Sequence, residues 1–333
     1  MKIAFVGFRH MHGKAAYDRI VAEGRHTVCA VCEEDPEARA ALLSDGIPVT
    51  HDNYAAMLAQ TSPDAVVVCD RFDLRGGRVI IDALRAGCHV IADKPLCTSL
   101  EELAAIERLA REKSLHVGLW LTLRELPYAA RLREQIAAGE IGEIHAVNFT
   151  GQHPLLLDMR PHWMFDPAKQ GGTINDLAIH GIDFISYVTG LPFARPLFAM
   201  ERNAFAKNTP AFGDTAQFVY QLANGCTVTG DTSYSAPDGM GYALPSYWRF
   251  TLWGTEGMIE VNHHDRAITI VHKTDKLPTT IDCADCPKVD VFDAFFEGIL
   301  GKPCEMTNEQ VIASTRAALT LEATAHFTPA SRI

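Results

Sequence analysis

One short segment of the chain contains the residue types that a proton-transfer site needs. After the glycine pair Gly171–Gly172, apolar residues recur at roughly helical spacing, which predicts a helix. In that helix Asp176 and His180 lie four residues apart on one face, and Asp183 follows one turn later. A carboxylate beside an imidazole fixes the tautomer of the ring and stabilises its charge, as a general base requires. The alternative is a solvent-exposed Asp–His pair with no chemical role.

Lys94 is a second residue with suitable chemistry. It stands in the sequence Ala92-Asp93-Lys94-Pro95, directly after an apolar run. Because a residue before proline is disfavoured in the helical region, we expect the Lys94 side chain to be held at the carboxyl end of a strand. An ammonium group there can donate a hydrogen bond to a substrate hydroxyl, and partial desolvation lowers the pKa of a lysine. A solvated loop lysine is the alternative.

The first third of the chain alternates short apolar runs with amphipathic segments. Runs that are this short and apolar on both sides indicate parallel strands covered by helices on both faces. We therefore predict an α/β fold that begins with a Rossmann-type, doubly wound parallel sheet, whose ligands bind at the carboxyl ends of the strands. The predicted strands are residues 2–8, 27–32, 64–69, 88–91 and 115–121.

The first strand-to-helix turn departs from the usual dinucleotide-binding fingerprint. That fingerprint has glycines at positions equivalent to residues 7, 9 and 12, and only Gly7 fits, with Gly13 one place late. Arg9 takes the second glycine position, where an arginine either crowds the pyrophosphate or pairs with it. The whole turn reads Gly7-Phe8-Arg9-His10-Met11-His12-Gly13.

An acidic residue at the end of the second predicted strand supports the same function. Glu33 follows the turn by about twenty residues, the position from which a carboxylate binds the adenosine ribose. Glu33 and Glu34 would also repel a 2′-phosphate, so the sequence favours NAD as cofactor, with NADP possible. The alternative for these acids is an exposed helix start.

The pattern changes near Leu123. A helix over residues 128–138 leads to several alternating strands, and Asn224-Gly225 between two of them is a strong hairpin signal. We predict an α+β domain with an open, largely antiparallel sheet, closed by helices over residues 289–300 and 308–325. The predicted domains are a Rossmann cofactor domain over residues 1–121 and a substrate and oligomerisation domain over residues 122–333.

Several motifs, taken in order, resemble the glucose–fructose oxidoreductase / inositol dehydrogenase / rhizopine-catabolism (Gfo/Idh/MocA) family of NAD(P)-dependent oxidoreductases. The resemblance covers essentially the whole chain. Its motifs are Asp93-Lys94-Pro95, Arg124-Glu-Leu-Pro127, Gly139-Glu-Ile-Gly142, the Gly171–Gly172 helix with Asp176, His180 and Asp183, and the turn Gly254-Thr-Glu-Gly257.

The resemblance implies catalytic roles for Lys94, Asp176 and His180. In such enzymes the histidine accepts the proton of the substrate hydroxyl as hydride leaves for the nicotinamide, the lysine binds and polarises that hydroxyl, and the aspartate orients or charges the pair. The predicted cofactor residues are Gly7, Phe8, Arg9, His10, Met11, His12, Glu33, Cys69, Asp70, Arg71, Arg75, Asp93 and Lys94. The predicted substrate residues are Lys94, Arg124, His162, Trp163, Asn175, Asp176 and His180.

The chain also departs from the family pattern. Asp93 replaces a glutamate, and Ala178 replaces a helix glycine. Cys69-Asp70-Arg71 stands where a Thr-Pro-Asn-like loop is usual, and Arg75 where a histidine is usual. These changes affect the predicted position of the cofactor and the choice between NAD and NADP. They affect the assignment of Lys94, Asp176 and His180 less.

The loop before the Gly171–Gly172 helix combines hydrogen-bonding groups with an aromatic face. Such a loop suits a sugar or polyol, and the resemblance places it beside the substrate. The alternative is that Trp163 packs in the core and His162 is exposed. The resemblance also implies subunit pairing through the second sheet, so we expect a homodimer or homotetramer.

Composition excludes several classes of partner. The 333 residues carry a net charge of −11 with no Lys/Arg-rich block, which argues against nucleic acid and anionic membranes. No apolar run approaches the roughly 20 residues that span a bilayer, and the N-terminus leads into a strand pattern, so we expect a cytoplasmic protein. The nine cysteines are scattered, which predicts free thiols, and neither the lone Cys283/Cys286 pair nor the histidines predict a metal.

Three functions compete at this stage. The first is an NAD(P)-dependent dehydrogenase acting on a hydroxyl carbon of a sugar, cyclitol or sugar acid. The second is a non-catalytic NAD(P)-binding regulatory protein of the same fold, which would have no need of Lys94, Asp176 and His180. The third is a hydrolase or lyase that retains its NAD through each turnover.

Overall fold

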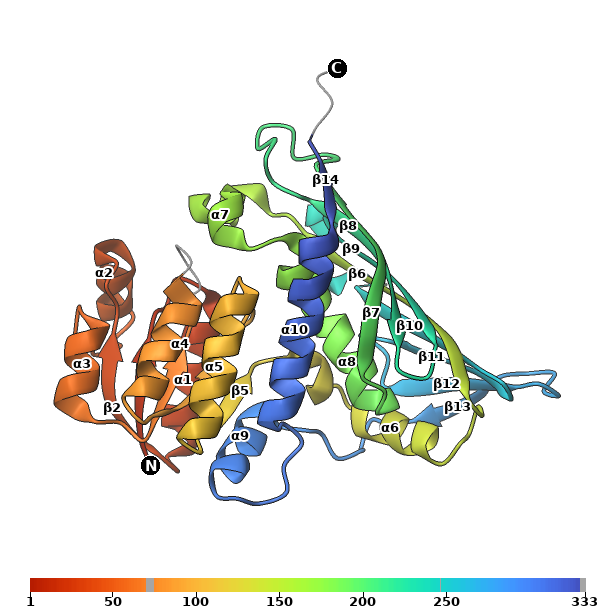
Figure 1. The fold of residues 1–333 in the computed structure, drawn as a ribbon, viewed down its shortest axis with the longest axis horizontal. Helices are drawn as coiled ribbons and strands as arrows, with labels where there is room; N and C mark the ends of the chain where they lie inside the picture. Colours follow the sequence, from red (N-terminus) through yellow and green to blue (C-terminus); the bar gives the residue numbers. More distant parts are fainter. Residues whose placement is uncertain (70–74, 246, 330–333) are drawn as a thin grey trace. The chain divides into compact units, whose positions relative to one another are not determined.

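The computed structural model describes residues 1–69, 75–245 and 247–329, and the chain forms two compact units (Figure 1). The first unit comprises Met1–Trp120 and Val291–Ile312, and the second comprises Leu121–Asp290 and Ala313–Ile333. The prediction that the whole of residues 122–333 belongs to the second domain was therefore wrong for Val291–Ile312. This segment returns to the first unit because its apolar helix covers part of the first sheet.

The first unit is built on a five-stranded, wholly parallel sheet with the order β2-β1-β3-β4-β5. Its central strands are buried along their length, as expected of a sheet with helices on both faces. The predicted doubly wound fold is confirmed. The strands are β1 (Lys2–Val6), β2 (Thr27–Cys32), β3 (Ala65–Val68), β4 (His89–Ala92) and β5 (Val117–Leu119).

Helices cover both faces of this sheet. Two of them, α4 and α5, lie side by side over one face (Figure 1). On the other face Phe292 of α9 packs against Trp120 and under the guanidinium of Arg19 of α1. The helices are α1 (Met11–Glu23), α2 (Pro36–Ser44), α3 (Tyr54–Thr61), α4 (Arg75–Arg85), α5 (Leu100–Glu112) and α9 (Val291–Ile299).

The second unit contains a nine-stranded sheet with the order β13-β12-β11-β10-β6-β9-β8-β7-β14. The β6–β9 and β14–β7 pairs are parallel, and the other neighbours are antiparallel, so the predicted largely antiparallel sheet is confirmed. The strands are β6 (Ile144–Pro154), β7 (Phe193–Arg202), β8 (Thr215–Leu222), β9 (Thr227–Ala236), β10 (Trp248–Gly254), β11 (Gly257–Asn262), β12 (Ala267–His272), β13 (Thr279–Asp282) and β14 (His326–Thr328).

One face of this sheet is covered by helix α8 (Ile179–Thr189), which is buried along nearly its whole length. Phe184 of α8 packs on Phe250, and a side chain at Gly181 would collide with the ring of Phe149. The remaining helical segments of this unit are η2 (Thr122–Glu125), α6 (Ala129–Ala137), η3 (Leu157–Met159), η4 (His162–Phe165), α7 (Pro167–Gln170), η5 (Ile174–Ala178) and η6 (Asp238–Ala243); α10 (Asn308–Thr324) begins in the first unit and ends in this one.

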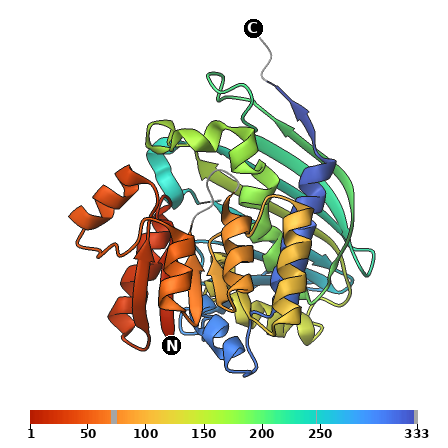
Figure 2. The same cartoon turned by 60° about the vertical axis from the view of Figure 1, so that its left-hand side comes forward.

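The length and the apolar character of a helix determine whether it can cross a membrane. Among the residues described, no helix has both the length and the apolar character needed to cross a bilayer. Figure 2 shows the same two sheets and their helices from a second direction.

Candidate active site

The turn between β1 and α1 has the backbone geometry of a dinucleotide-binding turn. Gly7 has a φ of 81°, a left-handed conformation that favours glycine. A Cβ atom on Gly13 would lie 3.1 Å from the carbonyl oxygen of Gly7, so α1 approaches the turn closely. Gly13 thus performs the close-packing role of the third fingerprint glycine, one position later than usual. The turn therefore fits a dinucleotide although Arg9 and His12 occupy two glycine positions.

The buried side chain of Glu33 is hydrogen-bonded to the backbone of this turn. Its carboxylate accepts hydrogen bonds from the backbone N–H of Phe8 (2.7 Å) and of Asp35 (2.9 Å), and the side chain is 1% exposed. Glu33 therefore holds the turn at Phe8, and its predicted contact with the adenosine ribose stays a prediction. Glu34 likewise accepts a hydrogen bond from the backbone of Tyr54. The preference for NAD over NADP, which rests on the charge of these two acids, likewise stays a prediction.

Asp93, at the end of β4, is the centre of a buried polar cluster. Its two carboxylate oxygens lie 2.7 Å from Nδ1 of His10 and 2.8 Å from Nδ1 of His12, and one of them also accepts the backbone N–H of Lys94. Burial by itself would raise the pKa of the Asp93 carboxyl. The two imidazoles outweigh that effect and hold its pKa well below the ordinary value. A charged carboxylate is thus fixed beside the turn that carries both histidines.

The same three side chains are of the types that bind a divalent cation. One ligand atom from each lies within 4.8 Å of the others. No metal-ligand spacing is visible in the sequence here, because Asp93 is 81 residues from His12 in the chain. Nδ1 of His12 is hydrogen-bonded to one carboxylate oxygen of Asp93, and Nδ1 of His10 lies at ion-pair distance from the other.

The other predicted cofactor residues lie around this turn or outside the described part. Lys94 is buried directly after β4, and Cys69 is buried after β3 next to Gly13. Asp70 and Arg71 lie outside the described residues, as do the side chains of Met11 and Arg75.

In the second unit, the segment that carries Asp176 is a π-helix, η5, that leads into α8. The predicted regular helix was therefore wrong in its first turn. π-Helical turns inside longer helices are frequent at functional sites. Asp176 is buried and accepts a hydrogen bond from the phenol of Tyr234, a buried residue of β9. Tyr234 could not be predicted as a partner of Asp176, because 58 residues separate the two in the chain.

His180, in the first turn of α8, is buried beside an aromatic cluster. Its ring centroid lies 6.0 Å from that of Trp248, edge to face. His153 packs edge-on against the same tryptophan, and its Nε2 lies 2.9 Å from the hydroxyl of Tyr247. Aromatic surface with a few convergent polar groups is typical of small-molecule sites. His153, Tyr247 and Trp248 were not predicted as site residues, because strand alternation can indicate that a residue is buried but not which residues it contacts.

Arg160 extends this cluster. Its guanidinium lies 5.8 Å from the ring centroid of Tyr234 and donates a hydrogen bond to the hydroxyl of Tyr242. The position falls in the loop that was expected to face a polyol, although that prediction named His162 and Trp163 instead. His162 is exposed, and Trp163 packs against the core around Phe212. For these two residues the structure agrees with the alternative that the sequence left open.

Arg124 has a structural role. It is 2% exposed, and it donates two hydrogen bonds, of 2.7 and 2.6 Å, to the two carboxylate oxygens of Asp183. Ser314 donates to the same carboxylate. The prediction that Arg124 binds substrate was therefore wrong, and Asp183 belongs to this ion pair. Asn175, another predicted substrate residue, is fully buried and donates its backbone N–H to Glu322.

Comparison with known protein families identifies the chain. Its residues 1–119 match the oxidoreductase family with an NAD-binding Rossmann fold, and its residues 129–260 match the GFO/IDH/MocA C-terminal domain. The chain belongs to the GFO/IDH/MocA oxidoreductase family. The resemblance inferred from the motifs is thus confirmed, and so is a nicotinamide dinucleotide as the cofactor class of the family.

Individual relatives are distant. A D-xylose 1-dehydrogenase (NADP(+)) of Haloferax volcanii is 26% identical over 73% of this chain and 70% of its own length. A D-glucoside 3-dehydrogenase of Escherichia coli is 26% identical over 67% of this chain and 64% of its own length. The solved structure of an aldose-aldose oxidoreductase from Caulobacter crescentus covers 97% of both chains with a TM-score of 0.77 at 19% identity, which establishes the shared fold.

Proposed function

We propose that this GFO/IDH/MocA oxidoreductase transfers hydride between a nicotinamide dinucleotide and a hydroxyl-bearing carbon of a sugar, cyclitol or sugar acid. The observation that carries the proposal is the buried Asp176 carboxylate, held by Tyr234 one turn before His180. A regulatory protein has no need of a supported carboxylate beside an imidazole. The names of the two relatives, a xylose dehydrogenase and a glucoside dehydrogenase, favour a sugar as substrate.

Each residue has a distinct task in this proposal. His180 accepts the proton of the substrate hydroxyl, and the negative charge of Asp176 stabilises the imidazolium that results. Lys94 donates a hydrogen bond to the same hydroxyl and favours its ionised form. Tyr234 fixes the orientation of the Asp176 carboxylate. The nicotinamide, when bound, accepts the hydride.

The cofactor residues belong to the first unit. We propose that the pyrophosphate is bound at the turn from Gly7 to Gly13, whose backbone fits it, and that His10 and His12 are held there by Asp93. The cofactor is NAD or NADP, and binding assays with both decide between them. The guanidinium of Arg9 lies near Glu33, directly after β2. If the protein prefers NADP, a substitution of Arg9 tests whether this side chain binds the 2′-phosphate.

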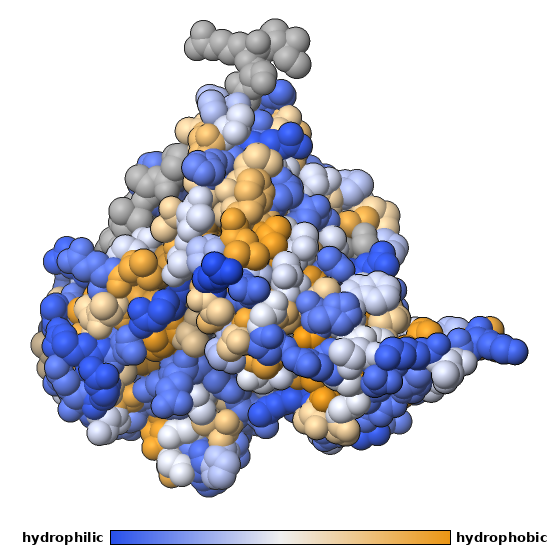
Figure 3. Space-filling model, turned by 45° about the vertical axis from the view of Figure 1, so that its right-hand side comes forward, coloured by the Kyte–Doolittle hydropathy of each residue, from blue (hydrophilic) through white to orange (hydrophobic). Residues whose placement is uncertain are grey.

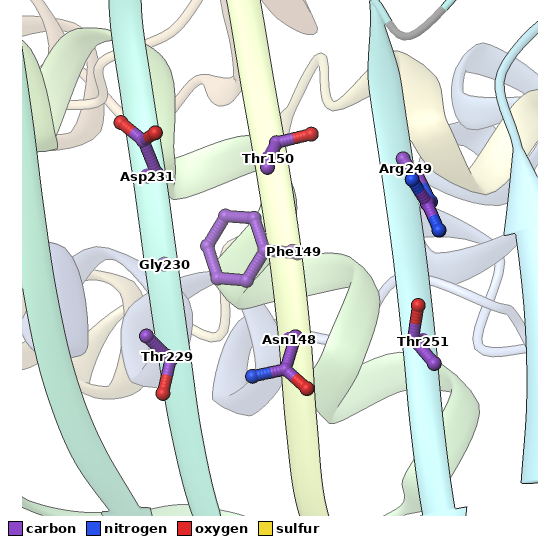
Figure 4. Close-up of a pocket in the computed structure, with 8 residues that line it drawn as sticks. All are labelled: Asn148, Phe149, Thr150, Thr229, Gly230, Asp231, Arg249 and Thr251. Atoms are coloured by element: carbon purple, nitrogen blue, oxygen red, sulfur yellow. The ribbon is translucent and has the colours of Figure 1, made fainter.

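We also propose that the chain forms a homodimer or homotetramer through the uncovered face of the nine-stranded sheet. Polar side chains stand on this face, and α8 lies behind it (Figure 4). They surround a depression of about 290 Å³ whose floor includes Gly230. Trp253 is 43% exposed, and apolar residues gather in patches on the surface view of Figure 3. A partly exposed tryptophan on an open sheet face is compatible with an interface between subunits.

Light scattering tests the oligomer. Thr229→Arg, at the centre of this face, is expected to reduce the molecular mass of the particle to that of one chain. Thr279→Arg, on the exposed strand β13, is the matched control and is expected to leave the mass unchanged. A wild-type mass of one chain would contradict the proposal.

The experiment that tests the activity is a panel of sugars, cyclitols and sugar acids, each with NAD and with NADP, followed by the absorbance of the reduced cofactor. A substrate that is oxidised by the wild type and spared by His180→Gln supports the proposal. Cofactor that copurifies and is never consumed would favour a hydrolase or lyase that retains NAD. We also propose a cytoplasmic location, which fits nine free cysteines and is tested by cell fractionation.

A further inference from the structure

Two glutamates meet at the start of the helical segment that carries Asp176 and His180. Glu201 lies on β7 and is buried, and Glu322 lies on the last part of α10, in the same unit. Their carboxyl groups are close enough to influence each other's pKa. Glu201 accepts the backbone N–H of Ile174 (2.8 Å), and Glu322 accepts that of Asn175 (3.2 Å). These N–H groups belong to the first turn of the π-helix, so the pair holds the segment immediately before Asp176.

The backbone is shaped around this pair. Gly172 has a φ of 92°, and a Cβ atom there would lie 1.9 Å from the carboxyl carbon of Glu322. A Cβ atom on Gly213 would lie 2.8 Å from a carboxylate oxygen of Glu201. The absence of a side chain at Gly172 therefore leaves room for the carboxyl group of Glu322 against the main chain. This is a physical reason for a glycine at this position of the Gly171–Gly172 motif.

Two adjacent carboxyl groups in a site of low polarity share a proton, because both cannot be ionised at once without strong repulsion. Burial raises the pKa of Glu201 to about 7, against the lowering effect of its backbone hydrogen bonds. Burial and the neighbouring Glu201 raise the pKa of Glu322 well above its ordinary value. The carboxylate of Asp176 adds to the negative potential at Glu201, and Tyr234 donates a hydrogen bond to Asp176.

We propose that Glu201 and Glu322 are positioning residues, which hold Asp176 and His180 in their working geometry through one proton shared between the two carboxyl groups. This inference rests on the proposed function for the role of His180. When the proton is lost, the two carboxylates repel each other and Asp176, and the π-turn is no longer held from both sides. The catalytic segment is then less ordered, and turnover falls on the alkaline side of the profile.

Glutamine at residue 322 is the decisive change. Its amide can donate to Glu201 and accept from Asn175, so Glu322→Gln imitates the protonated glutamate at every pH. Alanine removes both contacts. We expect Glu322→Ala to reduce kcat about tenfold to a hundredfold, because small displacements of a catalytic group have effects of this size. Glu322→Gln should restore kcat and abolish the alkaline loss, whereas Glu309→Gln, at an exposed position of the same helix, should behave as the wild type.

Amide hydrogen exchange gives a readout that does not depend on turnover. After correction for intrinsic exchange, peptides spanning residues 173–180 should lose protection in the wild type from about pH 5 to about pH 9, the range over which such a buried pair titrates. The same peptides of Glu322→Gln should show no such loss. Equal pH dependence in the two proteins, or wild-type kcat in Glu322→Ala, would overturn the inference. If Glu322→Ala does not fold, Glu322→Gln decides alone, and if no substrate is found, exchange still tests the shared proton separately from the activity.

Discussion

The phenol of Tyr234 donates a hydrogen bond to the carboxylate of Asp176, and both side chains are buried. Tyr234 belongs to a strand of the large sheet, whereas Asp176 belongs to the π-helix that precedes α8. The sheet therefore fixes the carboxylate from one side, while Glu201 and Glu322 hold the backbone of the same turn from another. An aspartate supported in this way has a defined orientation before any ligand arrives.

Removal of the Tyr234 hydroxyl tests this relationship. Tyr234→Phe keeps the ring but removes the donor, so we expect kcat to fall about tenfold or more with little change in KM, as is usual when a supporting hydrogen bond of a site is lost. The stability should fall by about 1–2 kcal/mol, because a buried carboxylate loses a partner. Steady-state kinetics and urea unfolding measure both quantities. Tyr220→Phe, at a buried tyrosine of the adjacent strand β8, is the control, and wild-type kcat in Tyr234→Phe would contradict the assigned role.

His180 and Lys94 should both act on the chemical step. We expect His180→Gln and Lys94→Met each to lower kcat by a factor of roughly 10² to 10⁴, the range for loss of a general base or of a polarising group. The losses should not add in the double variant if the two groups serve one step. Binding of the dinucleotide, followed by fluorescence titration, should persist in His180→Gln. Additive losses, or full activity of either single variant, would argue against a common step.

The Asp93 cluster should govern the acid stability of the first unit. The pKa of Asp93 is lowered well below its ordinary value when folded, so its contribution is present above the pKa of the unfolded chain. That contribution is lost as the pH falls through the folded pKa. We expect Asp93→Asn to destabilise the unit by about 1–3 kcal/mol at neutral pH, because the hydrogen bonds of the buried Asp93 carboxylate to His12 and to the backbone of Lys94 are weakened or lost.

Trp120 reports on the same region, since its ring lies 4.9 Å from that of His12. Urea unfolding followed by its fluorescence should show a shallower acid limb in Asp93→Asn than in the wild type. Asp52→Asn, at an exposed side chain of the same unit, is the control. A steep acid limb that survives in Asp93→Asn would assign the acid sensitivity to other carboxylates.

The glutamate pair predicts the opposite pH dependence for the second unit. The folded pKa of Glu201, about 7, is raised above its ordinary value, so the folded state binds a proton that the unfolded chain releases earlier. Stability from this pair is therefore present in acid and is lost as the pH rises through the folded pKa. We expect Glu201→Gln to flatten the decline of the unfolding temperature between mildly acidic and alkaline pH. A decline equal to that of the wild type, measured by calorimetry, would show that the pair does not share a proton.

Arg124 should matter for stability and little for chemistry. Arg124→Met leaves the buried Asp183 carboxylate without its ion pair, at a cost of about 3–5 kcal/mol, whereas the double change Arg124→Met with Asp183→Leu should recover much of the loss. Thermal unfolding measures the stability of each variant. The KM for the substrate should stay within about twofold of the wild-type value, because Arg124 makes no contact with the substrate in this assignment. A large rise in the KM of Arg124→Met with unchanged stability would show instead that Arg124 binds the substrate.

Much of the architecture could be predicted because it depends on local patterns. Short strands apolar on both sides predicted the parallel sheet, and Asn224-Gly225 predicted the β8–β9 hairpin, where Gly225 has a φ of 88°. The ordered motifs indicated the family, which the comparisons confirm. The assignment of Lys94, Asp176 and His180 to catalysis also came from sequence, and it stays a prediction until the variants are measured.

The partners of the polar side chains were decided only by the tertiary structure. The sequence did not predict that Glu33 holds the turn at Phe8, and Arg124 was expected at a substrate and instead pairs with Asp183. Helix α9 belongs to the first unit although it is far from the rest of that unit in sequence, and a periodic pattern of apolar residues cannot show this. The physical reason is the same in each case: a repeating pattern of apolar residues determines which face of an element is buried, whereas the hydrogen-bond partner of a polar group depends on which remote segment packs there.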